Sequence, residues 1–221
     1  MGAACGLSAL LVFAVLPRGS FVQQTGLAGS ATRLMLPLAA TMLLFFGPML
    51  QAILEDADVV SWRYWKNTMA TNVQPLIWWR NFVVAPIAEE WVFRACMIPV
   101  LALAGFGFWA KVFIPPLFFG VAHTHHVLSV LKDRGVSMQQ AVVVTAFQAF
   151  YTTVFGSMAA YYFLMTNCVY GPILAHAFCN MMGFPDFGGA LESKHRVALG
   201  ASYVFGVVAF VVFAMYMPMM V

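Results

Sequence analysis

Charged side chains are scarce in this chain: Asp, Glu, Lys and Arg make up 9% of its 221 residues, whereas 62% are hydrophobic. A water-soluble domain carries roughly 25% charged residues. The composition therefore excludes an ordinary soluble domain and predicts an integral membrane protein. The net charge is only +3 and no run of basic residues is present, so the sequence gives no support to a nucleic-acid partner.

Cysteine is also sparse, and the spacing of the cysteines matches no disulfide or metal-binding motif. The four cysteines include no Cys-x-x-Cys pair, which excludes a disulfide framework or a structural zinc pattern. We expect each of them to be a small buried hydrophobic residue. Alternation of polar and apolar residues between turn signals is also missing, so helices rather than a barrel are expected to cross the membrane.

Seven apolar segments, divided by polar breaks, predict an all-α, polytopic transmembrane helical bundle of roughly seven or eight helices with an intramembrane catalytic cavity. Residues 1–221 are expected to form a single transmembrane domain. The segments are 3–17, 34–54, 76–104, 108–131, 141–165, 168–183 and 199–219, and the main breaks are 55–72, 132–135 and 185–196. The first segment has about 15 residues where a span needs about 20. We interpret it as a signal anchor or as the remnant of a longer N-terminal region.

Three charged residues interrupt one of the most apolar stretches, residues 82–98. A charge at the centre of a bilayer costs about 2.5–3.5 kcal/mol on insertion scales, so such residues usually mark a function. Glu90 and Arg94 are four residues apart and can pair on one helix face. Glu89 is rotated by about 100° from Glu90. We expect a structural Glu90–Arg94 ion pair, with Glu89 as the carboxylate that acts as a general base.

Two further groups of polar residues lie in apolar sequence. His123, His125 and His126 fall within four residues, and histidine suits acid–base work because its unperturbed pKa is near 6.5. His123 and His126 can share a helix face, so we count His126 as a supporting residue.

The second group is His176 and Asn180, which are four residues apart on one helix face. They form either a hydrogen-bonding clamp for an oxyanion or a polar contact between membrane helices. Cys179 is a further candidate nucleophile, but the sequence shows no electropositive, accessible setting that would activate its thiolate.

Taken in order, these elements resemble the type II CAAX prenyl endopeptidases, the Ras-converting arm of the glutamate intramembrane protease family also called ABI or CPBP. The likeness covers residues 45–200, approximately. It is carried by Glu89-Glu90-x-x-x-Arg94, by Phe119-Gly-x-Ala-His123-x-His125-His126, and by His176-x-x-x-Asn180 followed by Met182-Gly-Phe-Pro185.

The resemblance implies a role for each matching residue. Glu89 would activate the attacking water with the help of His123, and His176 with Asn180 would stabilise the oxyanion. Glu90 and Arg94 match supporting positions. The implied mechanism is independent of metal and needs no cofactor.

The resemblance also implies a class of substrate and a cellular location. The substrates would be farnesylated or geranylgeranylated CaaX proteins, such as small GTPases, from which a hydrolase in the endoplasmic reticulum membrane removes the aaX tripeptide. A lipidated substrate already partitions into the bilayer. Members of the family usually have more sequence ahead of the first motif, so we expect a truncated or divergent N-terminus.

Two other functions fit parts of the pattern. A zinc metalloprotease would use Glu89, His123 and His176 as ligands, but the chain has no His-Glu-x-x-His motif, and the cation of Arg94 beside the site would repel a metal. A non-enzymatic transporter or scaffold would use the intramembrane charges as a relay.

Overall fold

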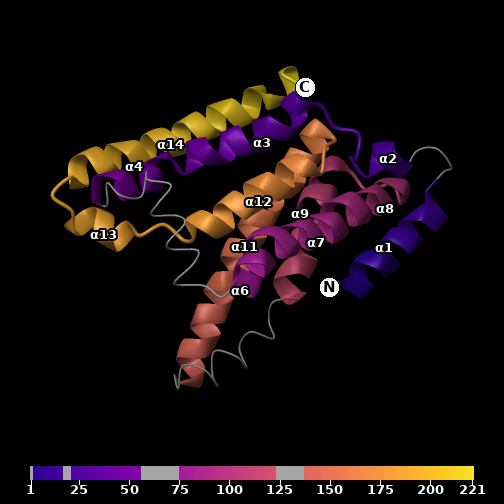
Figure 1. The fold of residues 1–221 in the computed structure, drawn as a ribbon, viewed down its shortest axis with the longest axis horizontal. Coiled ribbons are helices and arrows are strands. Elements are labelled where there is room, and N and C mark those ends of the chain that lie inside the picture. Colours follow the sequence, from indigo (N-terminus) through magenta and orange to yellow (C-terminus); the bar gives the residue numbers. More distant parts are fainter. Residues whose placement is uncertain (1, 17–20, 56–74, 123–136) are drawn as a thin grey trace. The chain divides into compact units, whose positions relative to one another are not determined.

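The computed structural model describes residues 2–16, 21–55, 75–122 and 137–221, and all regular structure within these ranges is helical (Figure 1). The all-α class predicted from the sequence is confirmed. The described residues form two compact units, Met1–Ala28 with Glu89–Val169 and Gly29–Ala88 with Tyr170–Val221. The single domain expected for residues 1–221 stays a prediction, and each unit is described by itself below.

The first unit contains most of the helices that surround the charged motif. Its elements are α1 (Gly2–Val15), α2 (Phe21–Gln24), the π-helix η3 (Trp91–Cys96), α8 (Met97–Leu103), α9 (Phe108–Ala122) and α11 (Met138–Thr166). α9 and α11 pack closely against each other. α7 (Ala85–Glu90) ends with the two glutamates.

The second unit contains the helix that carries His176 and Asn180. Its elements are α3 (Ala31–Leu44), α4 (Phe46–Glu55), α6 (Pro75–Trp79), the π-helix η2 (Arg80–Val84), α12 (Tyr170–Met182), α13 (Phe187–Glu192), α14 (Arg196–Tyr216) and the 3-10 turn η4 (Met217–Met219). α14 runs alongside α3 and α4, and α12 packs against α3 and η2 (Figure 1).

Two helices among the described residues are long and apolar enough to cross a membrane, Met138–Thr166 and Arg196–Met219. α11 alone reaches about 44 Å at 1.5 Å per residue. The pair α3 and α4 adds a third candidate if a bent pair counts as one span. The larger number of spans expected from the sequence stays a prediction.

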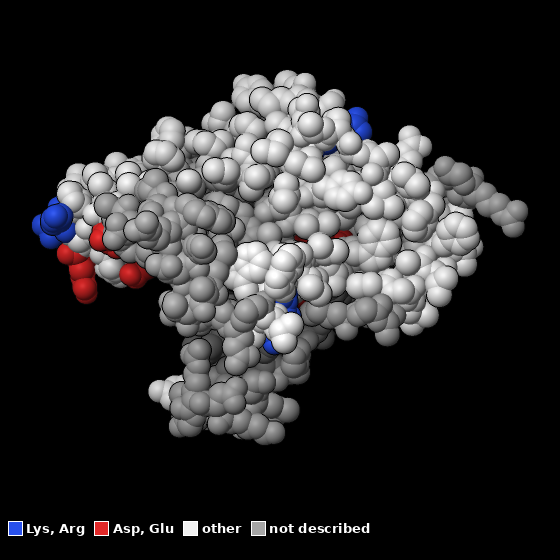
Figure 2. All heavy atoms as spheres, in the orientation of Figure 1, with Lys and Arg blue, Asp and Glu red and all other residues white. Residues whose placement is uncertain are grey.

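The surfaces of these long helices are apolar. Val143 and Phe150 on α11, and Val204 and Met215 on α14, are each more than half exposed. In the view of Figure 2 the described surface is nearly all uncharged, with acidic and basic side chains in a few small groups. Extended exposed apolar surface of this kind is typical of contact with lipid.

The segment expected at 34–54 contains a bend of 61°, where α3 meets α4. The ring of Pro48 would clash with the carbonyl four residues earlier, that of Leu44, where α3 ends. Residues 185–196 are not a plain loop but contain α13, because the Asp186 carboxylate accepts a hydrogen bond from the Gly189 N–H at 2.9 Å and caps the helix.

Each π-helix is followed within three residues by a proline. Pro86 is the second residue of α7, after η2, and Pro99 is the third residue of α8, after η3. A proline ring clashes with the carbonyl four residues earlier, and in both cases that carbonyl lies inside the π-helix. The wider turn relieves the clash without ending the helix. Single π turns within α-helices are frequent at functional sites.

Glycine allows a close helix contact in the second unit. A Cβ at position 206 of α14 would lie 2.7 Å from the Leu43 carbonyl oxygen and 3.3 Å from that of Leu44. Small residues at such crossings let the backbones of membrane helices approach each other. Gly200 lies on the same helix with open space where its Cβ would be.

We therefore predict that Gly206→Ala destabilises the protein by about 1–3 kcal/mol, because the added methyl group forces α14 away from α3. Gly200→Ala is the matched control and should leave stability unchanged or raise it by up to about 1 kcal/mol, because alanine favours a helix over glycine. Thermal unfolding in detergent micelles measures both. Equal unfolding temperatures for the two variants would contradict the close crossing.

Candidate active site

A buried ion pair lies at the junction of α7 and η3. Arg94 Nε is 3.1 Å from Glu90 Oε2, and both side chains are 0% exposed. The two residues are four apart, so the pair forms along one continuous helical segment. The ion pair predicted from their spacing is confirmed.

Arg94 also contacts two other helices of the first unit. Its Nη2 donates a hydrogen bond to the Gly156 carbonyl of α11 at 3.1 Å, and its guanidinium carbon lies 5.8 Å from the centre of the Phe119 ring of α9. A cation over an aromatic face at this distance is attracted to the ring. The guanidinium therefore joins η3, α9 and α11, in addition to balancing Glu90.

The approach of Arg94 to α11 requires a residue without a side chain at position 156. A Cβ there would lie 3.2 Å from Arg94 Nη2 and 3.0 Å from the Cβ of Pro116 on α9. Both contacts are tighter than ordinary van der Waals separation. Gly156 thus allows two contacts at once, the hydrogen bond to Arg94 and the close packing of α11 on α9.

Glu89 precedes the ion pair by one residue and is half-buried. Arg94 interacts electrostatically with Glu89 as well as with Glu90. The four-residue spacing pairs Arg94 with Glu90 alone, whereas in the structure Glu89 also lies within the field of the guanidinium. One cation therefore acts on two carboxylates that differ in burial.

His176 and Asn180 occupy α12 in the second unit. His176 is buried, with 5% of its surface exposed, whereas Asn180 near the end of the helix is exposed. Asn180 Nδ2 donates a hydrogen bond to the Asn81 carbonyl of η2 at 2.9 Å. The α12–η2 contact thus fixes the orientation of one of the two side chains expected to form the clamp.

The remaining predicted site residues, His123 and His126, lie outside the described residues, as does His125. The five described ones fall into two groups, Glu89, Glu90 and Arg94 in the first unit and His176 and Asn180 in the second. Their catalytic roles stay predictions. Within the described ranges, no group of three His, Cys, Asp or Glu side chains is arranged to hold a metal ion.

Sequence reasoning gave no role to three residues that support these groups. Phe119 and Gly156 contact the Arg94 guanidinium, and Asn81 accepts from Asn180. Two of these partners act through a backbone carbonyl, which every residue type supplies, so composition and spacing carried no signal for them. Pro86, in the middle of an apolar helix, was the one visible sign of irregular backbone near Asn81.

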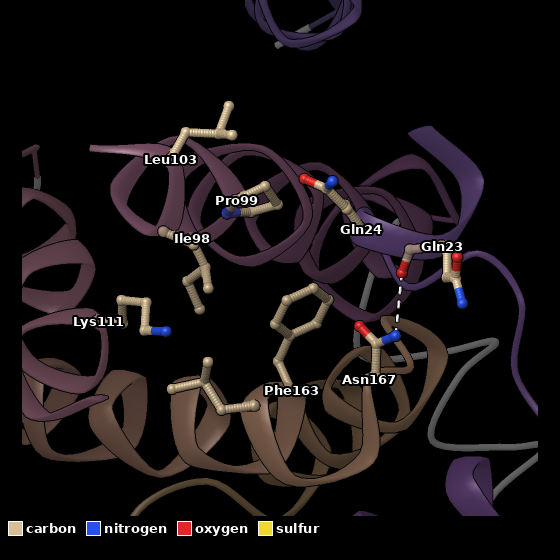
Figure 3. A pocket seen from close by; sticks show the side chains of 10 residues that line it. Gln23, Gln24, Ile98, Pro99, Leu103, Lys111, Phe163 and Asn167 are labelled. Carbon is tan, nitrogen blue, oxygen red and sulfur yellow. Dashed lines mark hydrogen bonds between the residues drawn. The ribbon is translucent and has the colours of Figure 1, made fainter. Parts of the chain in front are cut away.

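The first unit also contains an open cavity of about 530 Å³ at the ends of α2, α8, α9 and α11 (Figure 3). Lys111 extends into it beside Ile98 and Phe163. On the opposite side Asn167 donates to the Gln23 carbonyl at 3.0 Å. The cavity therefore combines one cation with amide groups and an apolar wall.

The described residues form only helices, with an apolar surface and a fully buried carboxylate–guanidinium pair, and these features define a helical membrane protein. Its sequence matches the family model described as Type II CAAX prenyl endopeptidase Rce1-like over residues 71–182. The match covers just over half of the chain and includes both glutamates and Asn180. The chain belongs to this family.

Curated relatives agree with the family match. The chain is 44% identical over 177 residues to CAAX prenyl protease 2 of Homo sapiens, covering 78% of this chain and 54% of the relative. It is 39% identical to the protein of that name in Rattus norvegicus, over 78% of this chain and 50% of the relative. It is also 39% identical to CAAX prenyl protease 2 of Arabidopsis thaliana, over 65% of this chain and 44% of the relative. The chain thus spans about half the length of these relatives. No solved structure gives a significant match.

We predict that removing one charge of the buried pair destabilises the protein by about 3–5 kcal/mol, because the other charge is left buried without its counter-ion. This applies to Arg94→Met and to Glu90→Gln. The double variant should recover part of the loss, because it buries no charge at these two positions. Thermal unfolding in detergent measures all three. A double variant that is no more stable than either single one would contradict the pair's structural role.

Proposed function

We propose that this chain is an intramembrane endopeptidase that removes the aaX tripeptide from farnesylated or geranylgeranylated CaaX proteins, such as small GTPases. The proposed location is the endoplasmic reticulum membrane, with several membrane spans. The proposal is supported by membership of the Rce1-like family and by relatives that carry the name CAAX prenyl protease 2.

The observation that carries the proposal is the fully buried Glu90–Arg94 pair directly beside Glu89. Burying charged groups in an apolar helix is costly, and a buried ion pair is by itself weak evidence for stability. If the Glu90–Arg94 pair had only a structural role, a further carboxylate next to it would not be needed. The half-buried Glu89 is the group that such an arrangement leaves for proton transfer.

In the proposed reaction Glu89 accepts a proton from a water molecule, and the resulting hydroxide attacks the carbonyl carbon of the prenylated cysteine. His123 assists in this transfer, with His126 as its supporting neighbour. The tetrahedral intermediate then breaks its bond to the nitrogen of the next residue, which leaves as an amine after receiving the proton. General acid–base catalysis of this kind contributes about 10²–10⁴-fold.

His176 and Asn180 donate hydrogen bonds to the oxyanion of that intermediate. Donors held in place before the reaction stabilise the charge as it develops, and losing one typically costs about 10²–10³ in rate. Glu90 keeps Arg94 neutralised, so that Arg94 can join α9 and α11 without leaving an uncompensated charge. The prenyl group adds about 0.8 kcal/mol per buried CH₂ to membrane binding, which concentrates the substrate in the bilayer.

We predict that Glu89→Gln lowers cleavage of a farnesylated CaaX peptide by about 10²-fold or more, because glutamine cannot accept the proton. Its thermal unfolding should remain close to that of the wild type. Glu192→Gln, at an exposed position of α13, is the control and should cleave normally. The released tripeptide is quantified by mass spectrometry, with an unprenylated peptide in parallel. Wild-type turnover by Glu89→Gln would refute the role of this carboxylate.

We further predict that cleavage persists after exhaustive treatment with metal chelators, because the proposed general base needs no metal to bind its water. Bound metal is measured by mass spectrometry in the same samples. Activity that is lost on chelation and restored by stoichiometric zinc would favour the metalloprotease alternative.

A further inference from the structure

The π-helix η2 leaves one backbone carbonyl without a donor from its own helix. The Ala85 N–H donates to the Arg80 carbonyl five residues earlier, in the π pattern. If the same pattern continued, the N–H of residue 86 would donate to the Asn81 carbonyl. Residue 86 is proline, which has no N–H. In this register, Asn81 therefore receives its hydrogen bond from outside the helix.

Asn180 supplies that hydrogen bond. Its Nδ2 lies 2.9 Å from the Asn81 carbonyl oxygen, and both residues belong to the second unit. A carbonyl oxygen can only accept, so the Asn180 amide must turn its NH₂ group toward η2 and its own oxygen elsewhere. One of the two hydrogens on this nitrogen is used by Asn81. The second is available to another acceptor.

We propose that Pro86 is a positioning residue for Asn180. By holding η2 in the π pattern and supplying no N–H, it reserves the Asn81 carbonyl for the Asn180 side chain. The amide is then locked in the orientation that presents its second N–H to a developing oxyanion. This inference rests on the proposed function for its catalytic consequence, but the hydrogen bond itself does not.

The chemistry of proline distinguishes this role from simple helix bending. With alanine at position 86, the ring no longer forces the turn open, so the helix can return to the α pattern. The Ala85 N–H then donates to the Asn81 carbonyl four residues earlier. Asn180 loses its acceptor, and its amide can rotate. Pro99 follows the other π-helix, η3, in the first unit, and it serves as the control proline.

A double-mutant cycle with steady-state kinetics tests the proposal. Complete loss of the donor in Asn180→Ala should lower kcat by about 10²–10³-fold. Pro86→Ala should lower it by about 10-fold, since a misoriented donor still contributes part of its effect, with KM nearly unchanged. The kcat of the double variant should equal that of Asn180→Ala alone, because without the Asn180 amide the proline no longer has a side chain to orient. The effects of Pro99→Ala and Asn180→Ala on kcat should instead multiply. Multiplicative effects of Pro86→Ala would overturn the proposal.

A second readout does not depend on cleavage. In protein labelled with ¹⁵N-asparagine, the side-chain NH₂ signals of Asn180 should shift and exchange faster with solvent in Pro86→Ala, but not in Pro99→Ala. Pro86 is fully buried, so Pro86→Val, which restores the N–H with a larger side chain, replaces Pro86→Ala if the alanine variant does not fold.

The two readouts separate the possible failures. Unchanged Asn180 signals in both Pro86 variants would refute the positioning role and leave the proposed protease activity standing. A shifted signal together with full activity of Asn180→Ala would refute the oxyanion role of Asn180 while leaving the contact with Asn81 intact. A shifted signal and non-multiplicative kinetics together support the inference.

Discussion

The structure of the first unit depends on keeping one guanidinium group buried. Arg94 is 0% exposed, and an arginine cannot lose its charge in a protein. Its surroundings must therefore supply compensation, and they do so from three helices: a carboxylate from Glu90, a carbonyl from Gly156 and an aromatic face from Phe119. Each partner constrains its own helix. The absence of a side chain at position 156 and the close packing of α11 on α9 both follow from this requirement.

In the second unit, irregular helix geometry, rather than a buried charge, determines how two helices are connected. Pro86 does not end the helix that begins at α6, and the helix instead widens into the π turn η2. A widened turn changes which backbone groups are satisfied within the helix. At η2 the consequence is a carbonyl that accepts from a side chain on α12. The same backbone irregularity that would weaken an isolated helix here connects two segments separated by 99 residues.

The features that were predicted best from the sequence are those that depend on one helix alone. The apolar segments located most helices, and the four-residue spacing was sufficient to predict the Glu90–Arg94 pair, because both side chains lie on one helical face. The bend at Phe45 and the short helix α13 were missed, since they depend on a single proline and a single capping carboxylate. The Asn81 carbonyl could not be anticipated, because tertiary packing selects it and residue type does not. Glycine is needed at position 156, but the sequence does not show which side chain its carbonyl meets. The family signature identified the candidate residues, while the contacts of Arg94 with Gly156 and Phe119 and of Asn180 with Asn81 came only from the structure.

Two glutamates and one arginine lie within six residues of one helical segment. Glu89 is additional to the Glu90–Arg94 pair, which already balances its own charge. A neutral pair would be the cheaper arrangement for a structural contact in an apolar helix, and a lone carboxylate would have no cation to attract it. With Glu90 in contact with the guanidinium, the field of Arg94 still reaches the half-buried Glu89. One carboxylate thus keeps the arginine in place, and the arginine in turn makes it less costly to hold a second carboxylate that is partly removed from water.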